Sequence, residues 1–126
     1  MKVAKLGDLE KKVMDIVWEK KKCTTRDVVQ NLKTNRHLAY TTVATILQRL
    51  WHKGLVIRKE SKTGYIYSPK VSKDRYSKSI AQSFLKSFIN SYGDTAIASF
   101  VDSIEKLPNA KRNYFLKLLE EHGKNK

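Results

Sequence analysis

Small and hydrogen-bonding side chains share one face of the segment from Tyr40 to Lys53. Apolar residues recur through this segment at the spacing of an amphipathic helix: Val43, Ile46, Leu47, Leu50 and Trp51. The opposite face carries a second set: Thr41, Thr42, Ala44, Thr45 and Gln48. Threonine hydroxyls can donate or accept hydrogen bonds at base edges, and short methyl groups can pack on thymine methyls. Such a face fits a DNA major groove about 12 Å wide, so this second set is the predicted base-reading set.

Cationic and polar residues flank this helix at positions where DNA phosphates would lie. The predicted backbone contacts come from the start of the preceding helix, from the helix itself and from a following hairpin: Thr24, Thr25, Arg26, Tyr40, Arg49, His52, Lys53, Arg58, Lys59 and Lys62. Phosphate contacts add affinity that is independent of sequence and weakens as salt rises. Any single threonine or lysine is equally compatible with a solvated surface position, so only the cluster carries this prediction.

Two shorter helices are expected before the helix at Tyr40. Asp8 is the predicted N-cap of the first, which the lysine-rich run at 19–22 ends. Thr24 and Asp27 have the spacing of a capping box and predict the start of the second, which closes near residues 33–35. A helix, a second helix, a turn and a third helix form the arrangement of a helix-turn-helix.

A β-hairpin is expected after the third helix. Gly54 can adopt the left-handed conformation that ends a helix. Residues 56–59 and 65–68, rich in β-branched and aromatic side chains, are predicted to form two short strands, and residues 61–64 supply the turn between them. Three helices followed by a basic hairpin are the layout of a winged helix-turn-helix, which we predict for residues 1–70.

Residues 71–126 are predicted to form a helical dimerisation domain, which makes the chain mostly α with a small β wing. Three helices are expected: from Lys73 to Tyr92, from about 96 to Pro108, and from Asn109 onward. The residues expected at the dimer interface are Tyr76, Ile80, Phe84, Phe88, Tyr92, Ile97, Phe100, Val101, Ile104, Tyr114, Phe115, Leu118 and Leu119. So many apolar side chains on about 55 residues exceed what one small helical unit can bury alone. A second copy would share the core; packing against the chain's own first half is the alternative.

The charge of the chain supports a polyanionic partner. Lys and Arg number 26 against 12 Asp and Glu, a net charge of +14. Residues 1–70 hold 16 of those cations and 6 of the anions (+10), and residues 71–126 hold 10 and 6 (+4). A field of this size attracts nucleic acid, although a merely solubilising surface is the alternative.

Several other function classes are disfavoured. The sequence offers no nucleophile–base arrangement, Gly-rich phosphate loop or paired carboxylates, so no enzyme is expected. Cys23 is the one cysteine, and His37, His52 and His122 fall on separate elements, so neither a metal nor another cofactor is expected. The deep major groove of double-stranded RNA would not admit such a helix, which disfavours an RNA binder. A protein-docking winged helix and a non-specific architectural DNA binder remain alternatives.

The chain is expected to be cytoplasmic. A lone cysteine cannot form an intrachain disulfide, which suits a reducing compartment. The sequence holds no apolar run of about 18 residues and no apolar segment typical of a signal peptide, so no membrane association is expected.

Four segments of the chain form a recognisable set: Leu9-Glu-x-x-Val-Met-x-Ile-Val-Trp18, Ala39-Tyr-Thr-Thr-Val-Ala-Thr-Ile-Leu-Gln-Arg-Leu50, Lys53-Gly-Leu-Val56 and Tyr67-Ser-Pro69. Together they resemble the penicillinase-repressor family, which contains repressors of beta-lactamase and methicillin-resistance genes. The resemblance implies a winged-helix repressor that binds a palindromic DNA operator as a homodimer, through dimerising C-terminal helices. In the antibiotic-responsive members, a membrane sensor-protease signals and the repressor is cleaved within its C-terminal region.

This chain departs from the family pattern at two places. The family is cleaved at an Asn-Phe bond in a Leu-Asn-Phe-Val segment, and here the segment is Ala98-Ser99-Phe100-Val101, with Ser99 in place of the asparagine. Ser99 and Phe100 are therefore the candidate cleavage position for a related, sensor-linked protease. Methicillin-type members carry a lysine and an arginine where this chain has Thr41 and Ala44, which implies a different operator. Non-proteolytic control of an unrelated stress or metabolic operon is the alternative. Copper-responsive relatives end in Cys-x-Cys motifs, which this chain lacks.

Overall fold

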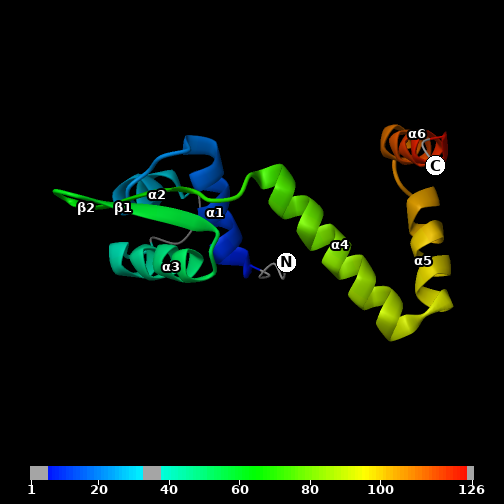
Figure 1. The fold of residues 1–126 in the computed structure, drawn as a ribbon, viewed down its shortest axis with the longest axis horizontal. Coiled ribbons are helices and arrows are strands. Elements are labelled where there is room, and N and C mark those ends of the chain that lie inside the picture. Colours follow the sequence, from blue (N-terminus) through cyan, green and yellow to red (C-terminus); the bar gives the residue numbers. More distant parts are fainter. Residues whose placement is uncertain (1–5, 33–37, 125–126) are drawn as a thin grey trace. The chain divides into compact units, whose positions relative to one another are not determined.

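A computed structural model describes residues 6–32 and 38–124 of the chain (Figure 1). Within these ranges it contains α1 (Asp8–Lys20), α2 (Thr25–Asn31), α3 (Tyr40–His52), β1 (Val56–Ser61), β2 (Gly64–Pro69), α4 (Lys73–Tyr92), α5 (Asp94–Glu105) and α6 (Asn109–Lys124). The predicted fold class, mostly helical with a small β wing, is confirmed. The chain divides into two compact units, Met1–Ala81 and Gln82–Lys126.

Side-chain caps determine where the first two helices begin. Gly7, rather than the predicted Asp8, is the N-cap of α1, and its N–H donates to the Glu10 carboxylate at 3.2 Å. The Thr24–Asp27 capping box is confirmed: the Asp27 N–H donates to the Thr24 hydroxyl at 3.1 Å, and the Thr24 N–H donates to the Asp27 carboxylate at 2.9 Å. Helix α2 ends at Asn31, and the predicted end near residues 33–35, together with His37, lies outside the described residues.

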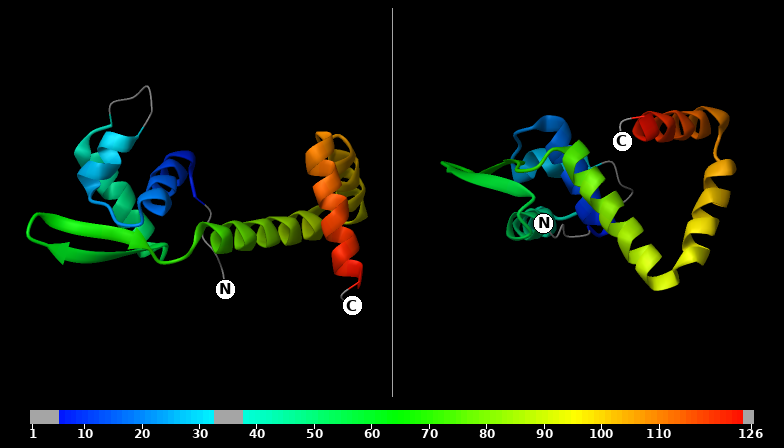
Figure 2. Two further views of the ribbon diagram at one scale, coloured as in Figure 1. Left: turned by 90° about the horizontal axis from the view of Figure 1, so that it is seen from above. Right: turned by 45° about the vertical axis from the view of Figure 1, so that its right-hand side comes forward.

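A hairpin follows α3 and projects beyond α1, α2 and α3 in both views of Figure 2. Gly54 follows α3 with a φ of 78°, a conformation that glycine adopts without strain, as predicted. Strands β1 and β2 pair antiparallel, with Arg58 opposite Tyr67 and Glu60 opposite Tyr65. Two backbone hydrogen bonds between Cys23 and Tyr67, of 3.0 and 2.8 Å, attach β2 to the chain between α1 and α2.

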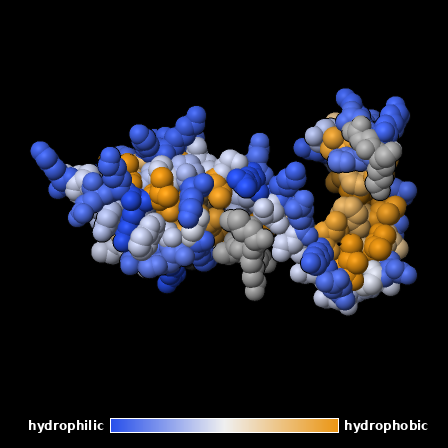
Figure 3. Space-filling model, in the orientation of Figure 1, coloured by the Kyte–Doolittle hydropathy of each residue, from blue (hydrophilic) through white to orange (hydrophobic). Residues whose placement is uncertain are grey.

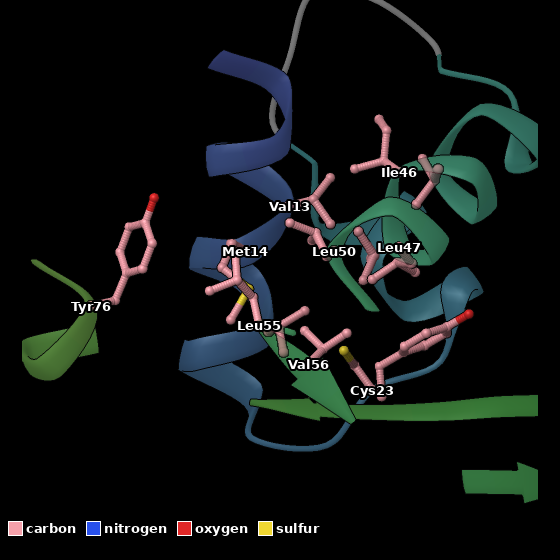
Figure 4. Close-up of a cluster of buried hydrophobic side chains, with 13 residues drawn as sticks. Val13, Met14, Cys23, Ile46, Leu47, Leu50, Leu55, Val56 and Tyr76 are labelled. Atoms are coloured by element: carbon pink, nitrogen blue, oxygen red, sulfur yellow. The ribbon is translucent and has the colours of Figure 1, made fainter. Parts of the chain in front are cut away.

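The core of the first unit lies between α1, α2, α3 and the base of the hairpin (Figure 4). Its largest fully buried side chains include Met14 of α1, Leu47 and Leu50 of α3 and Val56 of β1. The apolar face of α3 therefore points inward as its spacing predicts. Trp51 is the exception among the predicted stripe, because 37% of it is exposed at the end of the helix.

The beginning of α4 belongs to the first unit. Tyr76 is 9% exposed in the same core, 5.5 Å from the Trp18 ring, and Ile80 packs against that core as well. The Trp18 indole N–H donates to the Val71 carbonyl at 2.9 Å, and Lys73 pairs with Asp15 at 3.7 Å. The prediction that Tyr76 faces a partner subunit is therefore wrong, because its own chain covers it.

The second unit holds its apolar side chains at the surface. Phe84 and Phe88 stack at 5.9 Å, and the Phe100 ring lies 6.2 Å from that of Phe115. Among the described hydrophobic residues of this unit, Ala96 alone is buried. Figure 3 shows hydrophobic residues gathered over α5 and the adjoining part of α4.

Candidate nucleic-acid interface

The solvent-facing side of α3 carries the residues predicted to read bases. Thr41, Thr42, Thr45 and Gln48 are exposed and Ala44 is half-buried, whereas Val43, Ile46, Leu47 and Leu50 are buried on the other side. The Thr45 hydroxyl donates to the Thr41 carbonyl at 2.9 Å, one helical turn back. This bond holds the Thr45 side chain and leaves its methyl group and acceptor lone pairs for a ligand. The structure thus brings the predicted set together on one open face.

The residues at the start of α2 that are predicted to contact the DNA backbone differ in their exposure to solvent. Arg26 is exposed, with its guanidinium carbon 6.0 Å from the ring of Tyr40, which is itself 48% exposed. Thr24 is half-buried as the helix cap, and its backbone N–H lowers the pKa of Asp27 by a hydrogen bond to the carboxylate. Thr25 is only 7% exposed, because its place one residue after the cap turns its side chain into the core. That side chain therefore offers almost no surface to DNA, and a contact of Thr25 with the DNA backbone stays a prediction.

Lys53, a predicted phosphate contact, is bound by a carboxylate of the same chain. Its ammonium lies 2.8 Å from Glu10 Oε2 and 3.0 Å from Oε1. The hydrogen bond from Lys53 is the main cause that holds the pKa of Glu10 below its ordinary value of 4.5. Sequence reasoning missed Glu10 because the two residues are 43 positions apart and charge alone does not pair them. Any contact between Lys53 and a phosphate therefore competes with Glu10.

A depression of about 440 Å³ separates the start of α1 from the open face of α3. Its lining combines both elements: Gly7, Asp8, Leu9, Glu10, Thr42, Thr45, Ile46 and Arg49. The two acidic residues lie on the α1 side and Arg49 on the α3 side. A polyanion on α3 would therefore be attracted by Arg49 and repelled by the α1 border.

The wing carries the remaining predicted cations. Lys59 and Lys62 are exposed, Lys62 in the turn between the strands. Arg58 has aromatic partners that sequence reasoning missed: its guanidinium carbon lies 3.7 Å from the ring centroid of Trp51 and 4.2 Å from that of Tyr65. At the end of α3, Arg49 and His52 are also exposed, and the His52 ring lies 4.9 Å from that of Trp51.

The residues predicted for dimerisation fall into two groups. Tyr76 and Ile80 contact the core of the first unit. The others lie in the second unit, half-buried or exposed: Phe84, Phe88, Tyr92, Ile97, Phe100, Val101, Ile104, Tyr114, Phe115, Leu118 and Leu119. Ser99 and Phe100, the candidate cleavage position, lie in the middle of α5.

The sequence also makes predictions about the Cys23 thiol, possible metal sites and possible membrane-spanning helices. Burial raises the pKa of the Cys23 thiol to about 11, which keeps it protonated and unreactive at neutral pH. Over residues 6–32 and 38–124, no three His, Cys, Asp or Glu side chains form a group that could hold a metal ion. In the same ranges no helix combines the length and hydrophobicity required to cross a membrane.

Comparisons with known proteins agree with this arrangement. The family model described as Penicillinase repressor matches residues 6–121. The penicillinase repressor of Bacillus licheniformis is 26% identical over 125 residues, which cover 99% of this chain and 97% of that protein. The transcriptional regulator BlaI of Mycobacterium tuberculosis is 43% identical over 74 residues, 58% of this chain and 54% of that protein. The solved DNA-binding domain of the repressor BlaI aligns with a TM-score of 0.52 and 25% identity over 60% of this chain and 92% of that structure. This chain belongs to the penicillinase repressor family.

Proposed function

We propose that this chain is a sequence-specific transcriptional repressor that binds a palindromic DNA operator as a homodimer. The observation that carries the proposal is the open face of α3, where short polar side chains lie on a helix backed by a packed core. Such a helix can approach base edges in the major groove closely. Exposed cations at the start of α2, in α3 and on the wing would bind phosphates: Arg26, Arg49, Lys59 and Lys62.

A second copy of the chain is the proposed partner of the second unit. Several large hydrophobic side chains there are more than half exposed: Phe84, Tyr92, Val101, Tyr114, Leu116 and Leu119. Exposed apolar surface of this extent is rare on a monomer and is typical of an interface. A twofold dimer would present two α3 helices to half-sites about 34 Å apart, which explains why a palindrome is the proposed operator.

The proposed target genes are those of beta-lactam resistance, because the relatives are named penicillinase repressors. Their derepression is proposed to follow cleavage at Ser99–Phe100 by a sensor-linked protease. Both residues are exposed, but the Ser99 carbonyl accepts the Ser103 hydroxyl at 2.9 Å within α5. Proteases bind extended chain, so α5 must open locally before this bond is cut.

One observation favours a second candidate function. Ser99 stands where the family pattern has asparagine, and the Thr41 and Ala44 positions lack the cations of methicillin-type members. Both changes fit a regulator of a different operon, of stress or metabolic genes, that is released without proteolysis.

Binding to DNA duplexes tests the proposed function. A duplex is first selected from a random pool by the wild-type protein, and Thr42→Ala is then compared with wild type on the selected and on a random duplex. We expect about a fivefold loss on the selected duplex, since a base contact is worth about 1 kcal/mol at this size. The random duplex should bind nearly unchanged.

Thr95→Ala is the matched control, because Thr95 is an exposed threonine of α5 in the second unit. If Thr42→Ala loses the same affinity for both duplexes, the proposed base-reading role of α3 is wrong. The proposed derepression by proteolysis is tested separately, by measuring the mass of the repressor in cells after derepression. Intact protein at that point would contradict proteolysis but would not affect the proposed DNA binding.

A further inference from the structure

The Arg58 side chain joins the wing to the end of α3. We propose that Arg58 is a positioning residue, whose guanidinium between Trp51 and Tyr65 fixes the wing against α3 and so places Lys62 on the DNA backbone. This inference rests on the proposed function, because it assigns Arg58 a task within DNA binding. It differs from the prediction that Arg58 acts as one more phosphate contact.

The geometry ties three elements together at one point. Trp51 lies in the last turn of α3, Arg58 in β1 and Tyr65 in β2. The guanidinium carbon of Arg58 is 3.7 Å from one ring centroid and 4.2 Å from the other. Both distances are well inside the range of about 6 Å in which a cation and an aromatic ring attract each other.

The strand register explains why these side chains meet. Arg58 pairs with Tyr67 and Glu60 pairs with Tyr65, and side chains of paired residues lie on the same face of a sheet. Tyr67 is 4% exposed, so this face is the one that packs on the core. Tyr65 lies 6.2 Å from Tyr67, one step further out toward the turn. The Arg58 contact is therefore located where the hairpin leaves the core.

The outer part of the hairpin needs such a contact. Two isolated strands are only marginally stable in water, and the backbone bonds between Cys23 and Tyr67 hold only the inner part. Lys62 lies beyond Tyr65, in the turn, where a small change of hairpin angle moves it furthest. A wing held at one angle can bind phosphate with less loss of conformational freedom than a mobile one.

Arginine is suited to this position and lysine is not. A guanidinium is planar and stacks on aromatic faces, whereas an ammonium is a compact and strongly hydrated point charge. Trp51 and Tyr65 are 37% and 40% exposed, so the contact lies at the surface, outside the buried cluster. Replacing Arg58 by lysine should therefore keep the net charge and the core while it releases the wing.

A double-variant comparison with Lys62 tests the proposal. Duplex affinity is measured over a range of salt for the wild type, Arg58→Lys, Lys62→Gln and the double variant, on both a selected and a random duplex. Loss of one phosphate contact lowers the slope of log affinity against log salt by about one unit, so Lys62→Gln should do this in the wild-type background. In the Arg58→Lys background we expect Lys62→Gln to have less than half that effect. Arg58→Lys alone should lower affinity about fivefold without a change of charge.

Two controls separate positioning from other causes. Arg75→Lys, the same equal-charge change at an exposed arginine of α4 to which no DNA contact is assigned, should bind like wild type. Tyr65→Leu leaves Arg58 unchanged but removes one of its aromatic partners, so it should also reduce the effect of Lys62→Gln on the salt dependence. Thermal unfolding must show that Arg58→Lys and Tyr65→Leu remain folded at the binding temperature.

The outcomes distinguish this inference from the proposed function. If Lys62→Gln has the same effect in both backgrounds, Arg58 does not position the wing and the inference is wrong. If the wild type shows no preference for the selected duplex, sequence-specific repression is wrong. The random duplex still decides the inference in that case, because phosphate contacts do not require specificity.

Discussion

The two compact units use hydrophobic residues of the same types in opposite environments. The first unit collects thirteen side chains into one buried cluster, from Val13 to Tyr76. The second unit buries Ala96 among its described hydrophobics and leaves side chains as large as Phe84 and Tyr114 more than half exposed. A unit with its own core can fold alone, whereas one with an open apolar face gains most from a partner. The comparison teaches that the unit proposed to bind DNA has a core of its own, whereas the unit proposed to dimerise does not.

The largest effect on stability is expected when a large side chain of the buried cluster is truncated. Leu47 is fully buried, and Leu47→Ala removes its side chain and leaves a cavity. We expect the free energy of unfolding to fall by about 3 kcal/mol. Denaturant unfolding of the full chain measures this loss. Leu116→Ala, in the exposed surface of α6, is the control and should change monomer stability far less; equal losses would contradict the contrast between the units.

The second effect concerns assembly rather than folding. Phe84 is 66% exposed, and Phe84→Asp would place a charge in the proposed dimer interface. Because a buried unpaired charge is unfavourable, we expect dimerisation to weaken by at least about 2 kcal/mol, roughly 30-fold. Sedimentation at several concentrations measures the dissociation constant. Gln82→Asp, an exposed change two residues away, controls for added charge. An unchanged dimer in Phe84→Asp would remove Phe84 from the interface.

The third effect tests where the first unit ends. Trp18 donates its indole N–H to the Val71 carbonyl and contacts Tyr76, which ties the start of α4 to α1. Trp18→Phe keeps an aromatic ring but leaves that carbonyl without its donor, at a cost of about 1 to 2 kcal/mol. Hydrogen exchange of residues 71–81 should accelerate. Tyr92→Phe, at an exposed ring of the second unit, should leave that exchange rate unchanged. If both variants exchange alike, the start of α4 is not held by Trp18.

Local chemistry explains the parts of the fold that could be predicted from sequence. The inward face of α3, the Thr24–Asp27 box and the glycine after α3 each depend on residues within a few positions of one another. The error at the start of α1 is one residue, since the extended backbone of Gly7 rather than the side chain of Asp8 makes the cap. The base-reading set could be chosen because helical spacing alone separates the two faces of α3.

Contacts between distant residues could not be predicted. Tyr76 shares its spacing with Phe84 and Phe88, and periodicity does not reveal whether the same chain or a second copy covers a stripe. Lys53 and Glu10 are 43 positions apart, and Trp18 and Val71 are 53 apart. A chain with 26 cations offers many equivalent pairings for each carboxylate. Tyr76 of the predicted dimer interface and Lys53 of the predicted phosphate contacts both have partners that are distant in sequence, which periodicity and charge do not reveal.

The smallest effect on stability is expected from the loss of one ion pair, and each unit has such a pair. Glu10 is 16% exposed and pairs with Lys53 at 2.8 Å, whereas Glu120 in the second unit is 70% exposed and pairs with Lys124 at 3.4 Å. Glu10→Gln should lower stability at neutral pH by about 0.5 to 1 kcal/mol, because a partly buried pair is screened less than an exposed one. Glu120→Gln should have almost no effect.

The stabilisation by the Glu10–Lys53 pair should depend on pH. The hydrogen bond from Lys53 lowers the pKa of Glu10 in the folded state, so folding favours the carboxylate. The stabilisation is therefore complete above the ordinary value of 4.5 and is lost as pH falls through the lower folded-state pKa. Unfolding curves of wild type and Glu10→Gln should differ at pH 7 and converge in that acidic range. A difference that persists there would mean that the carboxylate charge is not its cause. Glu10→Gln also removes the competitor of Lys53, so affinity for random DNA should rise about twofold, while Glu120→Gln should leave it unchanged.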